Sequence, residues 1–182
     1  MKESSEELIR KTYYDPETGF TGVDKLYRIG LVAIDPFTKK ATVELLKKKS
    51  AIDVTEAMKK VFDELGIPEM VYTDEGSEFV NKDFHELMDQ NKVKHITTLR
   101  HASVAERFNR TLKELLYKYL QSTSSKTITN VLPKILKNYN NSYHKTIGMA
   151  PNDVNVDNLS EVWENIKKHS VRHYRPLLNP GD

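Results

Sequence analysis

Apolar residues recur along the chain with the periods expected of amphipathic helices and of short strands. Segments with apolar side chains three or four positions apart predict helices, and shorter runs rich in β-branched residues predict strands. The predicted helices span residues 50–66, 81–91, 102–120, 128–145 and 160–169, and the predicted strands span 27–35, 40–46, 68–74 and 93–99. A hairpin followed by alternating helices and strands indicates an α/β domain, a mixed sheet with helices packed on its faces.

The helix predicted over 102–120 has two different faces. Its apolar face carries Phe108, Leu112, Leu115, Leu116 and Tyr119. Glu106, Asn109, Arg110 and Lys113 share the other face, because their spacings of three, four and seven return to the same side of a helix. This polar face is either an ordinary solvated surface or a site in which the acid meets a cation and the bases meet phosphates.

Composition narrows the functional classes only slightly. The chain has 182 residues and a net charge of +2, which suits about one domain and argues only weakly for nucleic acid. It has no cysteine, which excludes disulfides, thiolate metal sites and the usual zinc fingers. Its N-terminus lacks a secretory h-region and no apolar run is long enough to span a bilayer, so we expect an intracellular protein without a membrane partner. His169 and His173 are interpreted as surface histidines.

Two carboxylates follow consecutive strand predictions. Asp74 ends the strand over 68–74, just before Gly76, which permits a tight turn, and Glu106 lies in the first turn of the helix after the next strand. Ligands collect at the carboxyl ends of strands in such sheets, so the two acids can converge and hold divalent cations for phosphoryl transfer. Alternatively, Asp74 only starts a turn and Glu106 only favours the helix dipole.

The bases continue the same argument along the helix. Arg110 and Lys113 lie one and two turns beyond Glu106, where they can hold phosphates that lead away from the metals. Asn109 can orient a water molecule or a base edge. The spacing is therefore compatible with a nucleic-acid substrate.

Three motifs carry a family resemblance. The stretches "VYTDEGSEFVNKDF" (71–84), "ASVAERFNRTLKE" (102–114) and "YNNSYHKTIGMAPNDV" (139–154) resemble the catalytic core of retroviral-type (DDE) integrases. "YYDPETGFTGVDKLYR" (13–28) resembles a motif upstream of the core in Polinton/Maverick-type elements, and "IDPFTKKATVELLKKKS" (34–50) resembles the family's second and third strands.

The resemblance implies a ribonuclease H-like fold and a strand transferase. Such enzymes hold two Mg²⁺ or Mn²⁺ ions between three acids, process the 3′ ends of element DNA and join them to target DNA. Asp74 matches the second acid and Glu106 the third, while Asn109, Arg110 and Lys113 match positions that contact DNA ends. The resemblance further implies a homo-oligomer that acts on DNA, in the nucleus.

The chain also departs from the family pattern. The strand that carries the first acid is not evident, and the nearest upstream acids, Asp15 and Asp24, fit its place poorly. The loop at "LRHAS" (99–103) is shorter than the family's. We therefore expect a lead-in over 1–25, a core over 26–156 that lacks its first strand, and an appendage over 157–182, truncated before a β-barrel or chromodomain-like module.

Two main hypotheses follow. The first is an integrase of a mobile element or virus, either active or inactivated by loss of the first catalytic aspartate. The second is a non-catalytic remnant that binds DNA or supports assembly through Arg110, Lys113, the lysines of 47–49 and the basic tail. A ribonuclease H-like nuclease that acts on hybrids fits less well, because the ERFNRTLK helix indicates the integrase branch.

Overall fold

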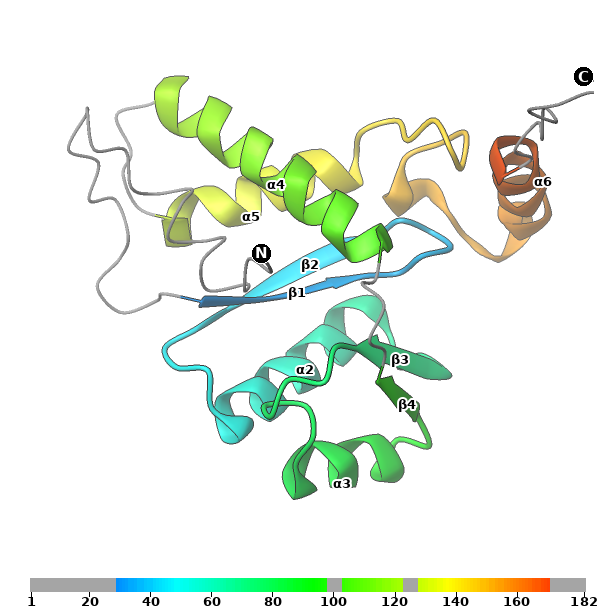
Figure 1. The fold of residues 1–182 in the computed structure, drawn as a ribbon. Coiled ribbons are helices and arrows are strands. Elements are labelled where there is room, and N and C mark those ends of the chain that lie inside the picture. Colours follow the sequence, from blue (N-terminus) through cyan, green and yellow to red (C-terminus); the bar gives the residue numbers. More distant parts are fainter. Residues whose placement is uncertain (1–28, 98–102, 123–127, 171–182) are drawn as a thin grey trace, which may run out of the picture.

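A computed structural model describes residues 29–97, 103–122 and 128–170 (Figure 1). The predicted lead-in over 1–25 lies outside these residues, and so do the active-site loop and the end of the tail. The elements are β1 (Ile29–Ile34), β2 (Ala41–Leu46), α2 (Ala51–Leu65), β3 (Met70–Thr73), α3 (Lys82–Gln90), β4 (Lys94–Thr97), α4 (Ser103–Ser122), α5 (Ile128–Asn140) and α6 (Leu159–Ser170), with 3₁₀ turns at Pro151–Asp153 and Val156–Asn158. Each predicted helix and strand is confirmed, with boundaries that differ by a few residues.

Local capping interactions fix several helix ends. The Ser50 hydroxyl accepts a hydrogen bond from the Asp53 amide at the start of α2. Gly66 ends that helix with a φ of 88°, a conformation that favours glycine. The Asn81 side chain accepts from the Phe84 amide at the start of α3. These caps are encoded in the local sequence, so the helix starts could be predicted closely.

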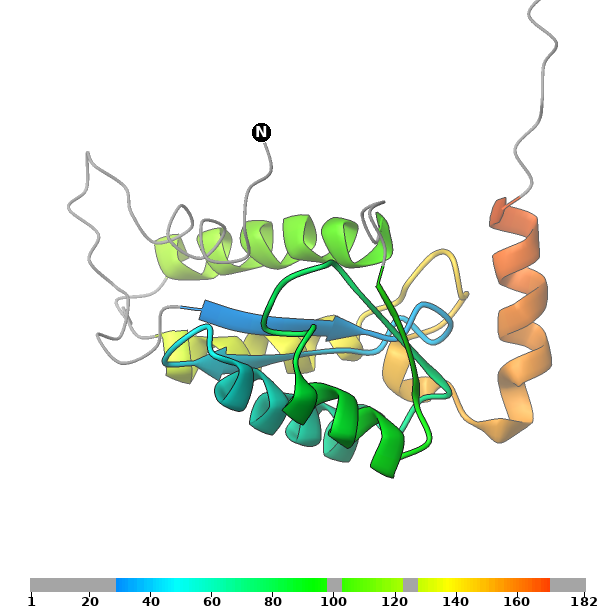
Figure 2. The ribbon, with the colours of Figure 1, turned by 60° about the horizontal axis from the view of Figure 1, so that its bottom comes forward.

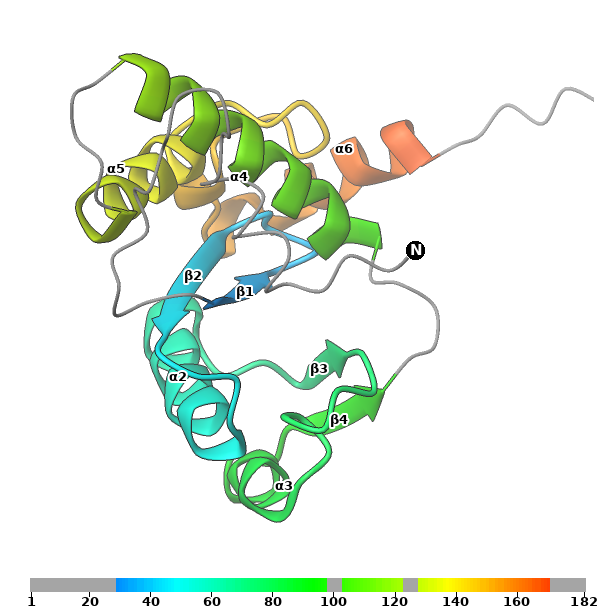
Figure 3. The ribbon, with the colours of Figure 1, turned by 60° about the vertical axis from the view of Figure 1, so that its left-hand side comes forward.

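The strands form two separate pairs. β1 and β2 are antiparallel, from Ile29 opposite Leu46 to Ile34 opposite Ala41, and β3 runs parallel to β4. Among the described strands, no ladder joins one pair to the other. Figure 3 shows β1 on the side of the hairpin that faces β3. The mixed strand directions confirm the predicted fold class, and the division into two pairs agrees with a core that lacks a strand.

The hairpin is the middle layer between two groups of helices (Figure 2). On one side, α4 and α5 form a core with the hairpin, built mainly from Val43, Phe108, Leu112, Leu116, Val131, Leu132 and Ile135. On the other side lie α2 and α3, whose core includes Val54, Met58, Val61, Phe62, Phe84, Leu87 and Met88. The ribonuclease H-like fold is thus an α/β/α arrangement. No helix within the described ranges is both long and apolar enough to cross a bilayer.

The helix predicted over 128–145 is shorter than expected. α5 ends at Asn140. The side chain of this residue is buried and binds the main chain of β2. After it, the His144 amide donates to the Met149 carbonyl and Gly148 takes a φ of 76°. Pro133 lies inside α5, on its exposed side, rather than in the first turn.

The contact of Asn140 with β2 predicts a large stability effect. Asn140 accepts from the Ala41 amide at 3.0 Å and donates to the Ala41 carbonyl at 2.8 Å. Asn140→Ala leaves both buried main-chain groups unpaired and should lower the free energy of unfolding in urea by about 2–4 kcal/mol. The control is Asn141→Ala, an exposed side chain whose loss should cost under about 1 kcal/mol. Equal effects of the two substitutions would contradict this role.

Candidate active site

Asp74 stands at the carboxyl end of β3, as the sequence predicts. Its Oδ1 accepts a hydrogen bond from the Gly76 amide at 3.3 Å, and its side chain is exposed. The Thr73 hydroxyl donates to the Asp74 carbonyl at 2.8 Å. Asp74 therefore starts a turn, as the structural alternative requires, and still presents its carboxylate to solvent.

α4 places the other predicted residues on one face. Phe108, Leu112 and Leu116 are buried against the hairpin and α5, which turns Glu106 and Arg110 outward to solvent. Asn109 and Lys113 are partly buried on the same face. Among the described residues, the buried Asn109 Oδ1 has no hydrogen-bond partner. A buried amide oxygen without a partner costs free energy.

The chain connection holds the two acids on one side of the domain. Thr97, the last residue of β4, pairs with Thr73 of β3. Only residues 98–102 connect β4 to α4, whose first turn contains Glu106. Figure 3 shows that β3 and β4 end on the side of the domain from which α4 begins. The ends of β3 and β4 and the start of α4 thus lie on one side of the domain, and the convergence of Asp74 and Glu106 at one edge stays a prediction.

The metal ligands among the described residues are too few for a site that holds two metal ions. In the described ranges, no group of three histidine, aspartate or glutamate side chains is arranged to hold a metal ion. Asp74 and Glu106 are exposed carboxylates of the kind that Mg²⁺ prefers, but a third ligand is not among these residues. Asp15 and Asp24, the upstream acids, lie outside the described residues. The described residues alone therefore do not fit a two-ion site.

The turn after Asp74 rests on a buried ion pair that sequence reasoning missed. Glu78 is 7% exposed, and its carboxylate lies 2.7 Å from the Lys49 Nζ. A Cβ at Gly76 would lie 2.6 Å from the Glu78 carboxyl atoms, so Gly76 provides space as well as a turn. Lys49, one of the lysines that would hold DNA in the non-catalytic hypothesis, therefore also binds Glu78, and its contact with DNA stays a prediction.

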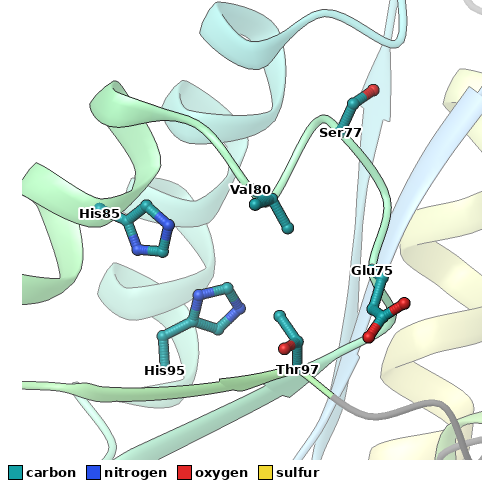
Figure 4. Close-up of a pocket in the computed structure, with 6 residues that line it drawn as sticks. All are labelled: Glu75, Ser77, Val80, His85, His95 and Thr97. Carbon is teal, nitrogen blue, oxygen red and sulfur yellow. The ribbon is translucent and has the colours of Figure 1, made fainter.

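A pocket of about 520 Å³ adjoins this turn (Figure 4). It is lined by Glu75, Ser77, Val80, His85, His95 and Thr97. The Thr73 hydroxyl lies 2.8 Å from the His95 Nε2 and gives its single proton to the Asp74 carbonyl. His95 must then donate from Nε2, so a chain of hydrogen bonds fixes the main chain at Asp74. The sequence offered no signal for this, since His95 is one histidine in a short strand.

Burial lowers the pKa of His95, and the nearby His85 lowers it further. The folded state thus prefers neutral His95, while the unfolded chain binds a proton near pH 6.5. This contribution to stability is complete above about pH 6.5 and is lost as the pH falls below it. The free energy of unfolding should decrease from pH 7 to pH 5.5, and less steeply in His95→Gln. The exposed His169→Gln is the control, and an unchanged slope in His95→Gln would contradict the prediction.

Gly76→Ala tests the packing of the turn. The new methyl group must displace the Glu78 carboxylate from Lys49, which should lower the free energy of unfolding by about 1–3 kcal/mol. Ser77→Ala, an exposed neighbour in the same turn, should change it by less than about 0.5 kcal/mol. Urea denaturation measures both variants. A Gly76→Ala protein as stable as the control would show that Glu78 is not fixed there.

Comparison with known proteins identifies the core. Residues 18–103 match the family model of the integrase core domain, so the match includes Asp74 and ends before Glu106. The catalytic core of the human T-cell leukemia virus 2 integrase, solved with magnesium, superposes with a TM-score of 0.62 at 27% identity, over 68% of this chain and 81% of that one. Residues 18–103 are thus similar to an integrase core domain, and the described fold is that of a retroviral-type integrase catalytic core. A simian T-cell lymphotropic virus intasome in complex with the PP2A regulatory subunit B56 gamma shares the fold, with a TM-score of 0.63 at 18% identity, over 85% of this chain and 54% of that one.

Two proteins that are similar to this chain in sequence are much longer than the region that matches. A transposon-derived protein of Caenorhabditis elegans is 35% identical over 133 residues, which cover 71% of this chain and 46% of that protein. The Gag-Pro-Pol polyprotein of human T-cell leukemia virus 2 is 28% identical over 109 residues, 58% of this chain and 8% of the polyprotein. The integrase core thus spans less than half the length of either relative.

Proposed function

We propose that the chain is the integrase of a mobile element of the Polinton/Maverick type. It would process the 3′ ends of element DNA and transfer them into target DNA with a divalent metal ion. The observation that carries this proposal is the outer face of α4, on which Glu106 stands with Asn109, Arg110 and Lys113, in the element that follows the β3–β4 pair. The similarity of this core to an integrase core solved with magnesium supports it.

The proposed roles follow from the chemistry of each side chain. Asp74 and Glu106 would bind Mg²⁺ or Mn²⁺, which polarises the phosphodiester when bound. Arg110 and Lys113 would bind phosphates of the DNA end along α4. Asn109 would orient the DNA end through its amide, whose oxygen has no hydrogen-bond partner among the described residues. A further carboxylate from outside the described residues has to complete a two-ion site.

Strand joining also has requirements beyond one active site. Two element ends have to be inserted together, so we propose that the protein works as a homo-oligomer. The related core was solved in trimeric and dimeric forms, which supports this. We further propose that it acts in the nucleus, where the target DNA of such elements lies.

One observation favours the second candidate function, a non-catalytic DNA-binding remnant. The described residues contain only two of the three acids that the reaction needs, and no group of three metal ligands. A chain without the first acid would keep the basic residues of α4 and lose turnover. It would bind DNA in a salt-dependent manner and without a metal.

Strand transfer on short duplex DNA, with Mg²⁺ or Mn²⁺, separates these functions. Asp74→Asn and Glu106→Gln should each reduce transfer to background, because each removes a metal ligand. Glu114→Gln, an exposed acid further along α4, is the matched control and should keep full activity.

Other outcomes of the strand-transfer and DNA-binding measurements would contradict one or both functions. Full activity of Asp74→Asn or Glu106→Gln would refute the assigned site. A wild-type protein that binds DNA but transfers no strand, with or without metal, would favour the remnant. A wild-type protein that binds no DNA would contradict both functions.

A further inference from the structure

Three basic side chains meet at one end of the domain, away from the α4 face already described. Lys39 lies in the turn between β1 and β2, Arg107 in the first part of α4, and His144 in the loop after α5. Figures 1 and 2 both show the β1–β2 turn, the start of α4 and the loop after α5 at the same end of the domain. We call Lys39, Arg107 and His144 the basic cluster.

Two contacts in or beside the hydrophobic core join the three segments. The hydrogen bonds of Asn140 with Ala41 join the end of α5 to the start of β2, two residues after Lys39. The rings of Phe108 and Tyr139 pack with their centroids 4.8 Å apart, which joins α4 to the end of α5. Arg107 directly precedes Phe108 in α4, and His144 lies in the loop that begins directly after Asn140. The cluster is therefore fixed by the core rather than by the surface loops.

Within the described ranges, no member of the basic cluster has a carboxylate at ion-pair distance. Asp35 is the acid nearest to Lys39, but its oxygens accept from the Phe37 amide and from the amide and hydroxyl of Thr38. The Lys39 ammonium donates to the Pro36 carbonyl, a neutral group.

The members of the basic cluster repel one another. Burial lowers the pKa of His144, and the charges of Lys39 and Arg107 lower it further. Burial also lowers the pKa of Lys39; Asp35 opposes this shift and Arg107 adds to it. In the part of the chain that the structure describes, the buried His144 Nδ1 has no hydrogen-bond partner. Like charges held together without a counter-ion cost free energy, and a bound anion would remove that cost.

We propose that Lys39, Arg107 and His144 bind a phosphate of the backbone of duplex DNA, as a contact separate from Arg110 and Lys113. This inference rests on the proposed function, which supplies DNA as the ligand. Arg107 directly follows Glu106 on α4, so a duplex whose end lies at the candidate acids passes close to the basic cluster. An arginine with a lysine is a common pair for phosphate recognition.

Fluorescence anisotropy of a short labelled duplex tests the proposal, in EDTA and over a series of salt concentrations. Arg107→Ala and Lys39→Asn remove one charge each. Asparagine is chosen at position 39 because Lys39 has a φ of 62°, which asparagine tolerates. Lys59→Ala is the control, because this exposed lysine lies on α2, on the other side of the hairpin.

Each cluster variant should reduce the slope of log K against log salt by about 0.9, the value for one lost phosphate contact. The control should keep the wild-type slope. Neither cluster variant should lower the free energy of unfolding by more than about 1 kcal/mol, since each removes a repulsion. Weaker binding therefore cannot come from unfolding.

The alternative outcomes separate this inference from the proposed function. If the wild type binds DNA and both cluster variants match Lys59→Ala, the basic cluster is not a DNA contact, while the proposed function stands. If the wild type binds no DNA, both fail. A second experiment measures the binding of inorganic phosphate to the wild type and to the cluster variants. If the variants weaken phosphate binding but leave DNA binding unchanged, the basic cluster binds a small anion instead, and the proposal is overturned.

Discussion

The alternation of side chains along β1 holds the whole domain together. Leu31 and Ala33 face the core made with α2 and α3, while Val32 and Ile34 face the core made with α4 and α5. Because the side-chain period of a strand is two, a shift of one residue in the hairpin register would exchange these faces. The two cores are therefore coupled through the β1–β2 hairpin, since β2 likewise contributes Val43 to one core and Leu46 to the other.

This coupling matters because Asp74 and Glu106 belong to different parts of the domain. Asp74 follows β3, in the strand pair that packs with α2 and α3, whereas Glu106 stands on α4, on the other side of the hairpin. No strand ladder joins the two pairs among the described strands. The relative position of the two strand pairs is maintained by α2, which packs against both the hairpin and α3, and by α3, which packs against β4. The geometry of the site thus depends on helix packing.

Much of the fold follows from local sequence, and much of the site does not. The caps Ser50, Gly66 and Asn81, together with the apolar periodicity, are signals within a few residues, so the helices could be predicted. The end of α5 could not, because Asn140 is recruited by Ala41, 99 residues away in sequence. The pairing of Lys49 with Glu78 and the basic cluster are likewise long-range contacts. Asp74, Glu106 and the polar face of α4 could be predicted from the sequence, because each lies at or follows a predictable strand or helix end.

The central claim is that Asp74 and Glu106 share a metal ion in an integrase core of the retroviral type. Paramagnetic broadening of backbone amide signals by Mn²⁺ tests it most directly, since the broadening depends on distance from the ion and needs no turnover. The account predicts that the amides of Glu75 and of Arg107 broaden together at the same low Mn²⁺ concentration, and that Asp74→Asn abolishes both effects. Broadening of only one of these amides, or of neither, would show that the two carboxylates do not meet.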